Sequence, residues 1–163
     1  GREASVVVGL QADEPEIRAD DFVRLINAAV AFPSVDCATL AGPIDPAHYG
    51  RPNVVKVQSD DDVEGSSIAY KFLRVMSPAG VETCEQFHIS VRHHLGVYAW
   101  RPAALRWYAS LDPSDGEQRE NLEQLRVLDN GGRIRIVEVE NARPGIDDED
   151  SYQEFCRRFR GQQ

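Results

Sequence analysis

The chain has 163 residues, a length that suits one domain of ordinary size. Its hydrophobic (42%) and charged (28%) fractions exclude collagen, a coiled coil and a wholly disordered chain. The formal net charge is −9 at pH 7, so the protein is not expected to bind nucleic acid or an anionic membrane surface, because phosphate contacts need a positive field.

Charge and cysteine content point to a cytoplasmic protein. Cys37, Cys84 and Cys156 are an odd number without metal-type or redox-type spacing, so we expect three free thiols in a reducing compartment. The sequence contains no apolar run of about 18 residues that could span a membrane. It starts at Gly1 rather than at Met, which we interpret as a chain that was trimmed or cut from a longer one.

The first third of the chain predicts one strand and one helix. Ala4–Leu10 contains a β-branched run and is a predicted strand. Asp20 is a predicted cap for a helix to Ala31, in which apolar residues recur at helical spacing. Residues 33–52 hold four prolines and two glycines, so we expect a long loop there, with room for a helical turn at Val35–Leu40.

The centre of the chain predicts strands. Asn53–Ser59 is a predicted strand that Asp60–Gly65 follows as an acidic turn; this turn begins like a calcium-binding loop but lacks the required Glu at its twelfth position. Apolar residues alternate in Ser66–Met76 and in Val81–Arg92, and turn residues separate the two segments. We therefore expect a hairpin with Phe72 and Phe87 buried on one face.

The last third predicts helices around one further strand. Residues 102–111 fit either a helix, which Pro102 favours, or a strand. Ser114 and Glu117 match a capping box for a helix to Leu128. A strand at Arg133–Glu140 and a last helix that opens at Asp147–Asp150 complete the chain, with Arg157, Arg158 and Arg160 at the helix end, where they complement its dipole.

These elements run in the order β-α-β-β-β-(α/β)-α-β-α. Strands in a meander with flanking helices are typical of the α+β class. We therefore predict a single α+β domain over residues 1–163, with one mainly antiparallel sheet and helices packed against it.

One cluster has the residue types of a metal site. Cys84, His88, His93 and His94 could supply thiolate and imidazole to zinc. On one strand, however, Cys84 and His88 would lie about 13 Å apart, which is too far to share an ion. We therefore expect no metal site.

The leading functional hypothesis is a non-enzymatic module that binds another protein. Aromatic and arginine side chains, which dominate protein interfaces, gather in one short segment: Tyr98, Trp100, Arg101, Arg106, Trp107 and Tyr108. An acidic inhibitor, immunity or regulatory domain that covers a basic partner surface fits this size and charge, and it needs no cofactor. The same aromatic residues could instead form part of the core.

The alternative rests on element order, which resembles that of the GNAT N-acetyltransferases. Residues 65–111 carry five basic against two acidic residues, which leaves a local anion pocket open. The resemblance implies a degenerate CoA-dependent acyltransferase or a CoA/anion-binding domain. Acetyl-CoA would then bind at a phosphate loop formed by Arg92, His93, Gly96, Val97 and Tyr98. The spacing of Arg92 and Gly96 and the presence of Tyr98 depart from that family's motif. A small-ligand sensor domain is a third possibility.

Overall fold

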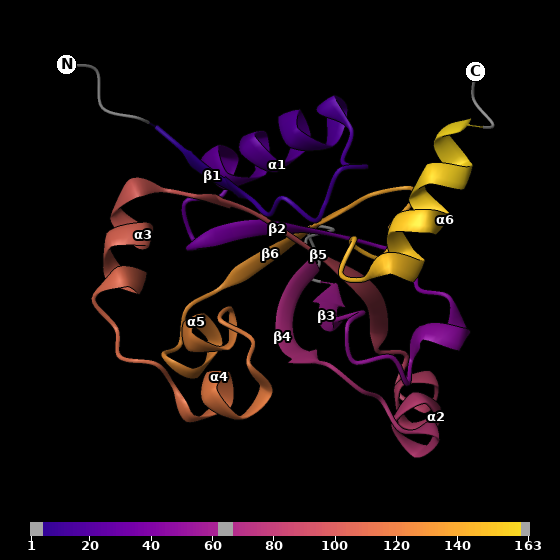
Figure 1. Cartoon of the computed structure of the whole chain (residues 1–163). Helices are drawn as coiled ribbons and strands as arrows, with labels where there is room; N and C mark the ends of the chain where they lie inside the picture. The colour runs from indigo at the N-terminus through magenta and orange to yellow at the C-terminus, as the bar shows by residue number, and fades with distance from the viewer. Residues whose placement is uncertain (1–4, 62–66, 161–163) are drawn as a thin grey trace.

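A six-stranded sheet forms the centre of the computed structural model, which describes residues 5–61 and 67–160 (Figure 1). Its strands are β1 (Val7–Leu10), β2 (Cys37–Gly42), β3 (Lys56–Asp61), β4 (Ser67–Leu73), β5 (Ser90–Trp100) and β6 (Ile134–Glu138). They lie in the order β1-β5-β2-β6-β4-β3, and β3 also pairs with β5. The strands β2 to β6 therefore close into a ring, with β1 added beside β5.

Helices cover the sheet from several sides. They are α1 (Ala19–Ala31), η1 (Pro46–His48), α2 (Pro78–Gln86), α3 (Pro102–Ala109), α4 (Asp115–Glu120), α5 (Leu125–Asp129) and α6 (Glu149–Arg160). In Figure 1, α1 lies over one side of the sheet, whereas α3, α4 and α5 lie together on another side. No helix within residues 5–61 and 67–160 is both long enough and apolar enough to cross a bilayer.

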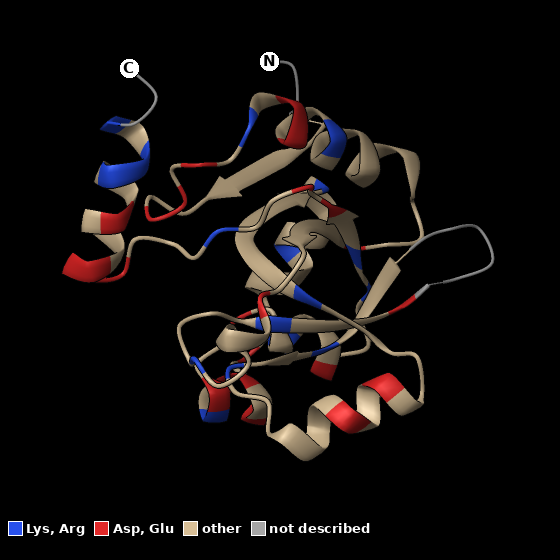
Figure 2. Ribbon diagram, turned by 90° about the vertical axis from the view of Figure 1, so that its right-hand side faces the viewer, with Lys and Arg blue, Asp and Glu red and all other residues tan. Residues whose placement is uncertain are grey.

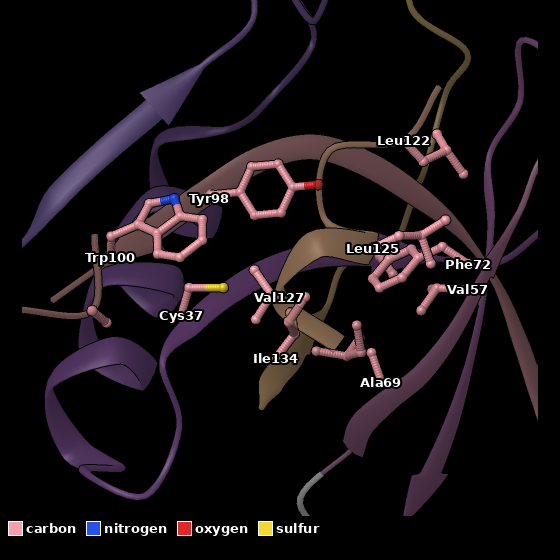
Figure 3. Packing of buried hydrophobic residues seen from close by; sticks show 13 residues of the cluster. Cys37, Val57, Ala69, Phe72, Tyr98, Trp100, Leu122, Leu125, Val127 and Ile134 are labelled. Atoms are coloured by element: carbon pink, nitrogen blue, oxygen red, sulfur yellow. The ribbon is translucent and has the colours of Figure 1, made fainter. Parts of the chain in front are cut away.

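Two groups of buried side chains stabilise this arrangement. Leu25 and Ala29 of α1 pack against Leu40 and Val97 of the sheet. On the other side, apolar residues of the sheet meet the α3–α5 segment, and Figure 3 shows the members of this second cluster, among them Cys37, Phe72, Tyr98, Trp100, Leu125 and Ile134. The mixed α/β fold predicted as a sheet with packed helices is therefore present, although its ring closure and the parallel pairing of β2 with β6 were not predicted.

The predicted loop at residues 33–52 is wrong in its centre, because β2 lies there between β5 and β6. All six residues of β2 are buried. A strand buried on both faces reads as an uninterrupted run of small and apolar residues without alternation, which is why the pattern was missed. The helical turn allowed at Val35–Leu40 does not form, because Cys37–Leu40 belong to the strand. Val35, which precedes the strand, is also buried.

The predicted hairpin is also wrong in its second half. Ser77 accepts a hydrogen bond from the Gly80 N–H (3.2 Å) and begins α2, with Pro78 at the first helical position. The chain returns to the sheet only at Ser90. Phe72 is buried as predicted, whereas the side chain of Phe87, at the end of α2, is 65% exposed.

Helix boundaries were predicted with mixed success. The first helix is confirmed, but its cap is Arg18, which makes no side-chain capping bond, rather than Asp20. The capping box of Ser114 and Glu117 is confirmed. The helix that it starts ends at Glu120 instead of Leu128, because Asn121 adopts a left-handed conformation (φ 52°).

Helix assignments at the two ends of the second half are confirmed. Pro102 starts α3, which settles residues 102–109 as helix. Figure 2 shows α6 with acidic residues at its start and basic residues at its end, as its sequence predicts. Ala4, at the start of the predicted first strand, and residues 62–65 of the predicted acidic turn lie outside the described residues.

Candidate functional site

A polar cavity of about 410 Å³ lies beside the middle of β5. Six separate stretches of the chain line it: residues 11–14, 53–55, 74, 93–98, 117–124 and 145–147. Such convergence of distant segments on one concave surface is typical of a small-ligand site. Arg74 is the one Lys or Arg among the described residues that line the cavity.

A larger depression of about 780 Å³ lies between the start of α1 and the end of α6. Charges in its wall are largely neutralised: Glu16 pairs with Arg143 (3.4 Å) and with Arg158, and Asp21 pairs with Arg24. The smaller cavity is the better candidate, because its lining contains buried polar groups that are not neutralised in this way.

Two adjacent histidines in β5 are almost completely buried in the cavity wall. His93 is 3% and His94 is 6% exposed. Desolvation by burial lowers the pKa of His93 to about 4 and that of His94 to about 3. Both imidazoles are therefore neutral at neutral pH, so each offers one hydrogen-bond donor and one acceptor rather than a charge.

The His94 ring is fixed by its neighbours. It packs edge-on against Phe72, with 5.0 Å between ring centroids, and lies 5.5 Å from the ring of Tyr98. The Thr39 hydroxyl donates its single proton to the carbonyl of Val97 (2.8 Å), so it accepts from Nε2–H of His94 (3.0 Å). Nδ1 of His94 is then the acceptor nitrogen of the neutral ring.

A β-bulge shapes the strand next to these histidines. Thr39 lies opposite Tyr98, but the next residue of β2 lies opposite Leu95, so two residues of β5 are inserted at this point. One of them is Gly96, whose N–H donates to Oε1 of Glu14 (3.2 Å). A Cβ atom at this position would lie 2.1 Å from Oε1 of Gln11, so a larger residue here would displace the tip of the Gln11 side chain.

This loop, Gln11–Glu14, connects two parts of the cavity. The carbonyl of Asp13 accepts a hydrogen bond from the Ile146 N–H (2.8 Å), which holds the loop against residues 145–147. Oδ1 of Asp13 is buried and has no hydrogen-bond partner among the described residues. The pKa of Glu14 is raised to about 7, mainly through desolvation by burial and also through the nearby charges of Asp13, Asp147 and Glu16, against the lowering effect of the Gly96 N–H.

The opposite wall is formed by Arg74 and the stretch that leaves α4. The Arg74 guanidinium donates to the carbonyls of Glu120 (2.7 Å), Asn121 (2.8 Å) and Pro52 (3.0 Å). Asn121 and the three residues after it face the cavity, and the side chain of Gln124 is 5% exposed. The cavity is therefore lined by the cation of Arg74, by the carboxylates of the Gln11–Glu14 loop and by the neutral imidazoles of His93 and His94.

Most of the predicted interface segment lies in or against the core. Tyr98 and Trp100 are buried, and their rings lie 6.1 Å apart (Figure 3). Tyr108 of α3 packs on Trp100 (5.0 Å), and Trp107 is half-buried against the same cluster. The two arginines differ: Arg101 donates to the carbonyl of Val35, and Arg106 is exposed.

The alternative phosphate-loop residues are divided by the structure. His93, Gly96 and Tyr98 line the cavity. Val97 is fully buried on the α1 side, and Arg92 donates to Ser59 and to Glu138 (2.5 Å).

The Cys/His cluster separates in the fold. Cys84 is buried in α2, where its sulfur accepts from Gln58 (3.1 Å), while His88 is exposed at the end of that helix. Within the described residues, no three or more His, Cys, Asp or Glu side chains are grouped as they would be around a metal ion.

Sequence reasoning missed three parts of the cavity. The Gln11–Glu14 loop was not selected from the sequence, although its acidic residues follow the strand β1 closely. Arg74 and the residues after Asn121 gave no local signal, because main-chain carbonyls from distant segments place them.

The fold is a mixed sheet with flanking helices, and several distant segments converge on one polar cavity. Such a cavity is typical of the substrate site of an enzyme. The sequence profile of the family described as "Cytidylyltransferase" matches residues 2–136. This chain belongs to the cytidylyltransferase family.

Relatives and a solved structure agree with this assignment. A 3-deoxy-manno-octulosonate cytidylyltransferase of Rhodopseudomonas palustris (strain BisB5) is 40% identical over 147 residues, which cover 90% of this chain and 57% of the relative. One of Chlorobium limicola (strain DSM 245) is 35% identical, covering 98% of this chain and 64% of the relative. The structure of a CMP:2-keto-3-deoxy-manno-octonic acid synthetase complexed with CTP superposes with a TM-score of 0.77 at 32% identity, covering 99% of this chain and 64% of that chain.

The comparisons overturn the leading functional hypothesis. Family membership places the chain among enzymes, so the non-enzymatic protein-binding or regulatory module is wrong, and so is the GNAT-like acyltransferase. The expected protein partner with a basic surface is wrong on the same ground, since the relatives are named for a reaction of a sugar acid. The chain spans about 57–64% of the length of the relatives described here.

Proposed function

We propose that this chain forms the sugar-acid side of an enzyme that transfers a cytidylyl group from CTP to 3-deoxy-manno-octulosonate. In this reaction a hydroxyl oxygen of the sugar acid attacks the α-phosphorus of CTP. The new P–O bond replaces the bond to the β-phosphate, pyrophosphate leaves, and the hydroxyl proton is released to a base or to water. The observation that carries the proposal is the cavity beside β5, together with the similarity to the relatives that bear this name.

The cavity suits a polyhydroxylated acid. Its volume falls within the roughly 300–1,000 Å³ of small-molecule sites. His93, His94 and Gln124 offer uncharged donors and acceptors for hydroxyl groups in a buried setting, where each hydrogen bond discriminates strongly. Arg74 supplies the positive charge that a carboxylate requires.

The acidic side of the cavity suits a nucleotide with its cation. Mg²⁺ is usually held by one or two carboxylates together with substrate phosphates. Asp13, whose Oδ1 is buried without a partner among the described residues, and Asp147, which also lines the cavity, would hold it. When bound, this ion would neutralise the negative charge of the phosphates.

Calorimetric titration of the purified chain with 3-deoxy-manno-octulosonate tests the proposal, with CTP and Mg²⁺ titrated separately. We expect saturable binding of the sugar acid and at least a tenfold weaker affinity in Arg74→Met, because the substrate carboxylate loses its cation. Arg106→Met is the matched control, since Arg106 is exposed and lies outside the cavity. Absence of binding to the wild-type chain, or equal affinity in Arg74→Met, would contradict the proposal.

A further inference from the structure

Lys56 is a fully buried lysine that does not belong to the cavity lining. It is the first residue of β3 and has no exposed surface. Its Nζ donates to the carbonyl oxygens of Arg51 and Arg74, both at 2.7 Å. Desolvation lowers the pKa of Lys56 to about 8, which reflects the cost of keeping an ammonium group in this position. Lysine is among the residues most rarely buried, so this placement calls for a specific role.

The two carbonyls that Lys56 holds belong to segments at the cavity. Arg51 precedes Asn53 and Val55, which line one part of the wall. Arg74 lines the wall itself, and its guanidinium continues the connection to the carbonyls of Pro52, Glu120 and Asn121. The cationic side chains of Lys56 and Arg74 thus bind five main-chain carbonyls from three separate segments.

This arrangement explains how irregular segments keep a fixed shape. Asn121 has a left-handed backbone (φ 52°), and neither it nor the stretch Arg51–Val55 lies in a strand. The carbonyls of Arg51, Pro52 and Asn121 lie outside the strands, and a carbonyl withdrawn from water without a hydrogen bond is costly. The ammonium group of Lys56, on its long stem, satisfies two carbonyls at once, which an apolar side chain cannot do.

We propose that Lys56 is a positioning residue that sets the Arg74 wall of the cavity and thereby the affinity for the sugar acid. It acts through Arg74 and through the carbonyl of Arg51 rather than by contact with the ligand. The identity of the ligand rests on the function proposed above, whereas the positioning role rests on the hydrogen bonds alone.

Lys56→Met tests this role, because methionine retains most of the side-chain volume but cannot donate to the two carbonyls. Lys71→Met is the matched control: Lys71 is the other lysine of the chain, and it is exposed on β4. Amide hydrogen exchange at two positions measures how firmly the wall is held. The Val54 N–H donates to the carbonyl of Arg51, and the Leu122 N–H donates to the carbonyl of Glu117, both at 3.3 Å.

We expect Lys56→Met to speed exchange at Val54 and Leu122 at least tenfold relative to the β2 amides, and to weaken 3-deoxy-manno-octulosonate binding at least tenfold. Lys71→Met should change neither. Unchanged exchange at both amides, or a uniform increase that includes β2, overturns the proposal, since the second result means only global destabilisation.

Two further outcomes separate this proposal from the proposed function. If the wild-type chain does not bind the sugar acid but the local exchange effect is present, the proposed function fails and the positioning role stands. If Lys56→Met does not fold, Arg74→Lys replaces it, because lysine keeps the charge but cannot span three carbonyls. Local acceleration at Leu122 in that variant supports the role of the connected cations, and its absence refutes it.

Discussion

Burial of His94 makes the stability of the fold depend on pH in a predictable direction. Its pKa falls from 6.5 to about 3 on folding, mainly through desolvation. Below pH 6.5 the unfolded chain therefore binds a proton that the folded chain does not, so the contribution of His94 to stability is complete above pH 6.5 and decreases as the pH falls toward 3. At about 1.4 kcal/mol per pKa unit, the loss between pH 7 and pH 5 is about 2 kcal/mol.

The effect of His94 is isolated by comparison with His94→Gln, whose amide can replace the bond to Thr39 without titrating. Urea denaturation at pH 7 and pH 5 should show that the wild type loses about 2 kcal/mol more than His94→Gln over this interval. His88→Gln, at an exposed position, is the control and should follow the wild type, because it removes no buried imidazole. Equal losses in the wild type and His94→Gln would refute the reasoning.

Two other substitutions test the packing. Phe72→Ala should lower the free energy of unfolding by roughly 3–5 kcal/mol, because Phe72 is 1% exposed. Phe87→Ala should change it by less than about 0.5 kcal/mol, because Phe87 is 65% exposed. Chemical denaturation measures both values, and similar costs for the two variants would contradict the structure. Gly96→Ala should displace the tip of the Gln11 side chain and weaken sugar-acid binding, while the free energy of unfolding changes by less than about 1.5 kcal/mol. The double variant Gly96→Ala/Gln11→Ala should be as stable as the wild type. If neither variant folds, the backbone around Gly96, and not the Gln11 side chain, fixes this position.

Local sequence signals predicted those elements that local physics determines. Ser114 and Glu117 form a capping box in the sequence and in the structure, since each partner lies within one helical turn of the other. Pro102 begins a helix for a similarly local reason. The β2 strand lacked such a signal, because its six buried residues are specified by neighbours at β5 and β6 that are distant in sequence.

The alternating pattern of Val81–Arg92 shows how a local signal can mislead. Apolar residues that alternate predict a strand with one buried face, yet Ser77 and Pro78 begin a helix just before this segment. The capping bond and the fixed φ of proline decide the outcome over Pro78–Gln86. Only the part from Ser90 onward joins the sheet, and there Ser90, Val91 and Arg92 are all half-buried, without the predicted alternation of burial.

Some of the residues selected from the sequence lie at the cavity. His93, Gly96 and Tyr98 were selected as an anion-binding loop, and all three line the cavity. They were selected from a resemblance in element order to the GNAT acyltransferases, an assignment that the family comparison overturns. Their partners across the cavity could not be found from spacing, because a bulge in β5 and the hydrogen bond between the Gly96 N–H and Glu14 create the juxtaposition.

One physical effect, desolvation, accounts for the unusual charge state of the cavity. It raises the pKa of Glu14 and lowers the pKa values of His93 and His94, so each group is shifted toward its neutral form. The chain carries a net charge of −9, yet burial favours the neutral forms of these three side chains in the cavity. The sugar acid proposed as the ligand would then find neutral imidazoles and the cation of Arg74 in one part of the lining, and the carboxylates of Asp13 and Asp147 in another. In the proposed site the position of that cation would decide the affinity, and Arg74 is held by main-chain carbonyls rather than by a carboxylate that would cancel its charge.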